Sequence, residues 1–172
     1  VAEGLMHGLV RDFRLAMKDP QDLHVRASIM WHSSLAENNV VKMGKTKDFQ
    51  AHNMEHQLSA FTDCNHCEGL AVLHPTYYRH IYKDGLGKFV RFATEVWRLN
   101  PADYENDEAL AIAGIDALVT FIREMGLPTT LRELGITDKS QLREIADSCF
   151  ISQGAFRPLT HDEILEIYEE CF

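Results

Sequence analysis

Apolar residues recur every three or four positions along most of the chain, which is the spacing of an amphipathic helix. In the first such run, near residues 2–17, Leu5, Leu9 and Phe13 share one face. Pro20 ends this run, because proline disfavours a helical conformation in the residue before it. The same spacing predicts further helices over residues 21–38, 50–61, 65–73, 76–83, 88–97, 106–125, 127–135, 138–149 and 160–171.

Turn and capping residues mark the limits of these runs. Pro75 is expected to break the chain between residues 65–73 and 76–83, and Gly126 to end the long run before it. Thr160 and Glu163 have the spacing of a capping box at the start of the last helix. No segment shows period-2 alternation or hairpin turns, so we predict an all-α fold, a multi-helix bundle. Large aromatic residues are assigned to its core, namely Trp31, Trp97, Phe89 and Phe92.

Composition narrows the class of protein. The 172 residues suffice for one domain with a single core, and a net charge of −9 argues against nucleic-acid partners. No apolar run approaches the roughly 18 residues of a membrane span, so no membrane partner is expected. Four cysteines are too few for a disulfide framework, which favours a reducing, cytoplasmic location. Because the first helical run begins at Val1 without a cap, we expect further sequence upstream.

The candidate chemistry lies in residues 52–66. His52 and His56 stand one helical turn apart, which places their Cβ atoms about 5–6 Å from each other. His66 follows, so three imidazoles fall within fifteen residues. Imidazole is a common ligand of zinc and ferrous iron, whereas an isolated helical pair is as often without any ligand role. Glu55 is a candidate only for orienting a ligating ring. The segment therefore predicts a metal or acid–base site.

Three other interpretations remain open at this point. His52 to His56 also match the H-x-x-E-H pattern of inverted zinc peptidases, with Glu55 as general base and Glu133 as distant ligand, although that class contains sheets and this chain predicts none. The Cys64/Cys67 pair lacks the context of a redox or zinc motif and is taken as incidental. A non-catalytic helical interaction domain is the third possibility. Structural or surface roles are assigned to His7, His24, His32, His74, His80 and His161.

The order of residues around the histidines is more specific than their number. His52 and His56 precede Leu58-Ser59-Ala60, and His66 stands fourteen residues after His52, before Gly69-Leu70-Ala71. This order resembles the signature of the iron-containing (group III) alcohol dehydrogenases, especially their butanol dehydrogenase branch. The resemblance extends over most of the chain, through residues 2–4, 25–27, 30–31, 34–36, 89–90, 96–97, 126–129, 131–135 and 157–159.

The resemblance implies a two-domain parent. In that family a Rossmann-like domain binds NAD(H) or NADP(H), and a C-terminal dehydroquinate-synthase-like helical domain holds a divalent metal, iron or zinc, through an aspartate and three histidines. Residues 1–172 would be this helical domain, truncated at its N-terminus and without residues that bind the nicotinamide cofactor. His52 and His66 would be metal ligands, and His56 a catalytic non-ligand that relays a proton. With two of four ligands, we expect the isolated chain to hold metal weakly.

The implied activity is that of an NAD(P)-dependent alcohol dehydrogenase or aldehyde reductase acting on a small alcohol or aldehyde. The metal would polarise the substrate oxygen during hydride transfer. The isolated chain, lacking the nucleotide-binding domain, is expected to be inactive, and the family resemblance implies a homodimer. Cys67 stands where the family usually has glycine, which would place a thiol close to the metal.

Overall fold

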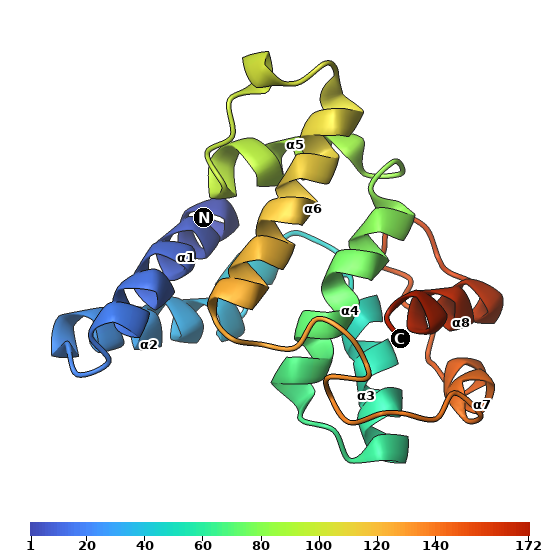
Figure 1. The fold of residues 1–172 in the computed structure, drawn as a ribbon. Coiled ribbons are helices and arrows are strands. Elements are labelled where there is room, and N and C mark those ends of the chain that lie inside the picture. The colour runs from blue at the N-terminus through green and yellow to red at the C-terminus, as the bar shows by residue number, and fades with distance from the viewer. The chain divides into compact units, whose positions relative to one another are not determined.

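The computed structural model describes all residues from Val1 to Phe172 and contains eight α-helices and no strand (Figure 1). The predicted all-α fold is thereby confirmed. None of the helices has both the length and the apolar character needed to span a membrane. The α-helices are α1 (Ala2–Lys18), α2 (Leu23–Glu37), α3 (Gln50–Thr62), α4 (His66–Ile81), α5 (Leu86–Arg91), α6 (Asp107–Glu124), α7 (Leu142–Asp147) and α8 (His161–Glu170).

The chain divides into two compact units. One comprises Val1–Thr46 and Leu86–Ala117, and the other Lys47–Gly85 and Leu118–Phe172. Helices α1, α2 and α5 belong to the first unit, whereas α3, α4, α7 and α8 belong to the second. All three histidines of the predicted site therefore lie in the second unit.

In the first unit, α1 packs along α2. Gly8 allows this close approach, because a Cβ atom there would lie 2.8 Å from ring atoms of His32. Asp12 is buried and accepts hydrogen bonds from Ser28 Oγ at 2.5 Å and Arg11 Nε at 2.7 Å. The assignment of Trp31 to the core is wrong: its side chain is 64% exposed, because α2 buries none of its residues.

In the second unit, α3 packs against α4 and α7, and α4 packs against α8. The core between them is mostly apolar but also contains the buried polar side chains of Gln50 and Glu55. Tyr168 is buried as well and donates a hydrogen bond to the Met54 carbonyl at 2.7 Å. Burying a side chain of this size stabilises the fold by about 1.5–3 kcal/mol. The core side chains with almost no exposure include Met54, Leu58, Leu73, Tyr77, Ile164 and Tyr168.

The predicted break at Pro75 is wrong. Helix α4 continues through this proline from His66 to Ile81. A proline inside a helix costs roughly 3 kcal/mol because it removes one backbone hydrogen bond. Here Pro75 is itself buried in the core, and the packing of α4 against α3 and α8 offsets that cost.

Two other predicted boundaries differ from the structure. Residues 127–135 form turns instead of a helix, because the Glu133 carboxylate accepts the backbone N–H groups of Thr129 and Thr130 and Gly135 takes a φ of +86°. The predicted helix over 88–97 is α5 followed by a π-helical turn at Phe92–Val96. The capping box at the start of α8, in which Thr160 and Glu163 satisfy each other's backbone N–H groups, is confirmed.

Candidate metal centre

The start of α3 is fixed by polar contacts. The Asp48 carboxylate accepts the Gln50 backbone N–H at 2.8 Å, and the Gln50 side chain bonds to the Phe150 carbonyl and the Ser152 N–H. The Asp48 contact satisfies one of the backbone N–H groups that a helix start leaves without partners, and the Gln50 contacts tie the start of α3 to residues 150–152. They set the direction in which α3 presents His52 and His56.

A tight reversal follows α3 and brings His66 back towards it. Asp63 ends the helix in the left-handed region, with φ +55° and ψ +27°. Asn65 then caps α4 by accepting the backbone N–H groups of Cys67 and Glu68 at 3.0 and 3.2 Å. His66 is consequently the first residue of α4, and its ring faces the histidines of α3.

The structure brings the three predicted site histidines together. One nitrogen from each of His52, His56 and His66 lies within 4.8 Å of the other two. The ring centroids are 5.2 Å apart for His56 and His66, 5.4 Å for His52 and His66, and 5.9 Å for His52 and His56. The side chain of His66 is 44% exposed, so solvent reaches the cluster.

Glu55 lies behind this cluster. It is completely buried, and its carboxylate accepts hydrogen bonds from Nδ1 of His66 and Oγ of Ser59. Because a carboxylate only accepts, the proton of neutral His66 resides on Nδ1, and Nε2 keeps its lone pair. Gly69 makes room for Glu55, since a Cβ atom at that position would lie 2.9 Å from two of its side-chain atoms. The carboxylate therefore orients the His66 ring and fixes its tautomer.

This arrangement disagrees with the peptidase interpretation. A general base must reach the water or substrate, whereas Glu55 is buried and occupied by His66 and Ser59. Glu133 accepts backbone N–H groups from its own turn and is not part of the histidine cluster. The two carboxylates that this mechanism needs are thus both engaged elsewhere.

His52 sits against two further rings. Phe49 stacks on it with centroids 4.4 Å apart and planes 9° from parallel, and His74 approaches edge-on at 6.4 Å. Burial lowers the pKa of His52, and the neighbouring imidazoles lower it further, against an opposing effect of Glu55. A neutral imidazole is the form that binds a metal, so this environment favours ligation.

His74 is the site neighbour that the sequence assigned only a structural or surface role. It is partly buried, and its Nδ1 donates a hydrogen bond to the Leu70 carbonyl at 2.9 Å. Burial lowers the pKa of His74 as well. The predicted helix over residues 65–73 ends before His74, so the prediction did not connect His74 with His66. In the structure α4 continues without interruption, and both histidines lie on it.

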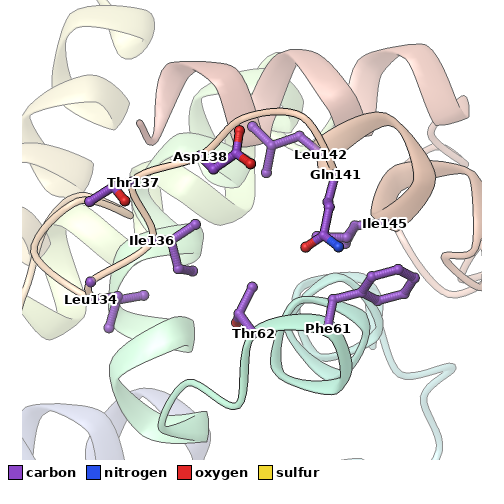
Figure 2. Close-up of a pocket in the computed structure, with 10 residues that line it drawn as sticks. Phe61, Thr62, Leu134, Ile136, Thr137, Asp138, Gln141, Leu142 and Ile145 are labelled. Carbon is purple, nitrogen blue, oxygen red and sulfur yellow. The ribbon is translucent and has the colours of Figure 1, made fainter.

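A separate hollow of about 250 Å³ lies where the end of α3 meets residues 134–138 and α7 (Figure 2). Its walls combine apolar side chains such as Phe61, Leu142 and Ile145 with polar ones such as Thr62 and Asp138. None of the three histidines lines it. The hollow is therefore distinct from the metal centre.

An all-helical fold in which three imidazoles converge from α3 and α4, one of them oriented by a buried carboxylate, contains a candidate metal centre. The donor set fits iron or zinc, because neutral imidazole suits both. A sequence model of a protein family, described as "Fe-containing alcohol dehydrogenase family, C-terminal", matches residues 1–172 of this chain. The chain belongs to this family.

Its relatives are named as dehydrogenases and reductases. The chain is 33% identical to NADH-dependent butanol dehydrogenase A of Clostridium acetobutylicum, over all of this chain and 45% of that protein. It is 28% identical to the NADPH-dependent aldehyde reductase YqhD of Escherichia coli, over 98% of this chain and 43% of that protein. A solved structure of YqhD superimposes with a TM-score of 0.89 at 26% identity, covering 99% of this chain and 45% of that one. The chain thus spans less than half the length of these relatives.

Proposed function

We propose that this chain is the helical, metal-binding part of an NAD(P)-dependent alcohol dehydrogenase or aldehyde reductase. His52 and His66 hold the divalent metal, and His56 relays a proton. The observation that carries the proposal is the convergence of the three imidazoles within 4.8 Å, with Glu55 behind His66. The membership of the family and the names of the relatives support it.

Each residue of the centre has a separate task. His52 and His66 supply neutral ring nitrogens, Glu55 fixes the tautomer of His66, and Phe49 restrains the ring of His52. When bound, the divalent metal, iron or zinc, supplies Lewis acidity that stabilises negative charge developing on the substrate oxygen.

His56 is suited to move the proton. Reduction of an aldehyde adds a hydride to the carbonyl carbon and requires a proton on the oxygen, and oxidation of an alcohol requires the reverse. His56 is exposed, lies on the same helix face as His52, and neither of its nitrogens bonds to a protein group. An imidazole ring can both donate and accept a proton, so His56 can serve the reaction in either direction.

The remaining parts of the reaction come from the parent enzyme. The nicotinamide cofactor, NAD(H) or NADP(H), is bound by a Rossmann-like domain, and an aspartate and a further histidine complete the metal coordination. The match to a C-terminal family model and the greater length of the relatives support this division. We propose that the parent is a cytoplasmic homodimer that acts on a small alcohol or aldehyde. The names of the relatives, a butanol dehydrogenase and an aldehyde reductase, support the substrate class.

The test uses the full-length parent. His52→Ala should remove most of the bound metal, whereas His56→Ala should lower turnover several-fold or more and leave the metal content nearly unchanged, as measured by elemental analysis beside steady-state kinetics. His24→Ala, on the exposed surface of α2, is the control. Equal metal loss in the His52 and His56 variants would refute this division of labour.

A further inference from the structure

We propose that within this chain alone His56 acts as a third metal ligand, so that the 172 residues bind one divalent cation through His52, His56 and His66. The inference rests on the proposed function in placing the metal at this cluster. It assigns His56 a different task when the other ligands of the parent are absent. A three-imidazole site replaces the weak two-ligand site that the sequence predicts.

The positions of the rings carry the inference. Three imidazoles that bind one ion tetrahedrally through nitrogens about 2.0–2.1 Å from it have ring centroids roughly 5.2 Å apart. The observed centroid separations are 5.2, 5.4 and 5.9 Å. His56 is therefore placed relative to His66 as a ligand would be, and its separation from His52 is only slightly larger.

The nitrogens themselves need only a small adjustment. They lie within 4.8 Å of one another, whereas nitrogens on one tetrahedral ion are about 3.4 Å apart. Rotation of the three rings about their side-chain bonds would have to close this difference. Histidines one turn apart on a helix are also a familiar chelating pair, because both rings project from the same face.

The rings have free coordinating atoms. His66 uses Nδ1 for Glu55 and so leaves Nε2 for a ligand. Neither His52 nor His56 forms a hydrogen bond or ion pair with a protein group. Binding one cation through all three rings would therefore break no existing hydrogen bond of the chain.

Three protein ligands are the usual number in an open zinc site, which keeps its fourth position for solvent or substrate. In the parent, the additional aspartate and histidine fill the coordination sphere and release His56 for proton transfer. The same imidazole would then have two roles, decided by whether those ligands are present.

The experiment titrates the metal-free 172-residue chain with Co²⁺, followed by its visible absorption spectrum, and with Zn²⁺ in competition with a chromophoric chelator. We expect one ion per chain and an absorption typical of four-coordinate Co²⁺. Alanine at His52, His56 or His66 should each weaken binding by about tenfold or more. His24→Ala should bind like the unchanged chain, and circular dichroism should show that each variant keeps its helix content.

Two results would overturn the inference. One is an unchanged affinity in His56→Ala beside a clear loss in His52→Ala, which would leave the proposed function intact. The other is failure of the unchanged chain to bind one ion. An unchanged affinity in His52→Ala would instead contradict the proposed function as well. Because a variant can fail to fold, ring ¹⁵N resonances of the unchanged chain provide a second test: Zn²⁺ should shift all three histidines, and a shift of only His52 and His66 would also refute the inference.

Discussion

The rings of Phe49 and His52 are stacked almost in parallel, with centroids 4.4 Å apart. Phe49 is held by two contacts of its own: its backbone N–H donates to Ser152 Oγ at 3.2 Å, and the Lys47 ammonium lies 4.6 Å from its ring centroid. A restrained aromatic face next to the imidazole limits the ring orientations that His52 can adopt. In the proposed metal centre, the segment before α3 thus contributes to the site without supplying a ligand.

Replacing Phe49 with leucine should weaken metal binding by a few-fold, because the His52 ring loses its stacking partner. Phe49→Tyr should restore most of the affinity, since stacking needs only the ring. The measurement is Zn²⁺ affinity together with the line widths of the His52 ring resonances. Phe61→Leu, at the other end of α3 and outside the cluster, is the matched control. Equal affinities in Phe49→Leu and Phe61→Leu would contradict the positioning role.

Glu55→Ala should lower both metal affinity and stability. Removal of a carboxylate that orients a ligating histidine typically costs about 10- to 100-fold in affinity. The deletion also leaves a cavity in a fully buried position and takes away partners of His66 and Ser59, a cost of about 1–3 kcal/mol. Metal titration and urea unfolding measure the two effects. Glu144→Ala, on the exposed side of α7, should change neither, and an unaltered affinity in Glu55→Ala would remove Glu55 from the centre.

Gly69→Ala should destabilise the second unit by about 1–3 kcal/mol, the usual cost of overpacking. The new Cβ atom would lie 2.9 Å from Glu55, whose side chain cannot yield freely because His66 and Ser59 hold it. Gly87→Ala offers a matched control, since its Cβ would meet nothing within 4 Å and alanine favours a helix over glycine. Thermal unfolding should therefore shift in opposite directions for the two variants. A neutral Gly69→Ala would show that α3 and α4 separate easily.

Asp12 should make the first unit sensitive to acid. Burial by itself would raise its pKa, but hydrogen bonds from Ser28 and Arg11 and the charges of Arg11 and His32 outweigh burial and lower the pKa below its ordinary value. The folded state therefore binds the proton more weakly than the unfolded state. The resulting stabilisation is complete above the ordinary carboxyl pKa of about 4 and is lost as the pH falls through the lower folded-state pKa.

The comparison is the free energy of unfolding at pH 6 and at pH 3. The difference between the two values should be smaller in Asp12→Asn than in the unchanged chain, because asparagine does not titrate. Asp147→Asn, whose side chain is 54% exposed, should leave the difference nearly unaltered. If Asp12→Asn retains the full pH dependence, other carboxylates account for the acid sensitivity.

Features with a local cause were predictable from the sequence. The helical spacing of apolar residues predicted the all-α fold, and the spacing of Thr160 and Glu163 predicted the capping box of α8. The spacing of His52, His56 and His66 predicted their grouping, because both ends of the segment are helical and the break between them is short.

Features decided by packing were not predictable in the same way. Pro75 stays helical because its neighbours in the core hold α4 together, and Trp31 is exposed although α1 packs along α2. The sequence indicated Glu55 as a candidate for orienting a histidine ring, but not that its side chain would be completely buried against His66. The turn at 127–135 depends on the Glu133 carboxylate meeting two backbone N–H groups, a contact that helical propensity does not reveal.

The left-handed turn at Asp63 has a consequence for the order of folding. It closes α3 and α4 into a helical hairpin, so all three imidazoles meet although His52 and His66 are only fourteen positions apart in the sequence. Short loops lose little chain entropy on closure, and contacts between near neighbours in sequence form early. The cation site can therefore assemble within this hairpin before α7 and α8 have joined it, and a cation bound at that stage would favour the native pairing of α3 with α4.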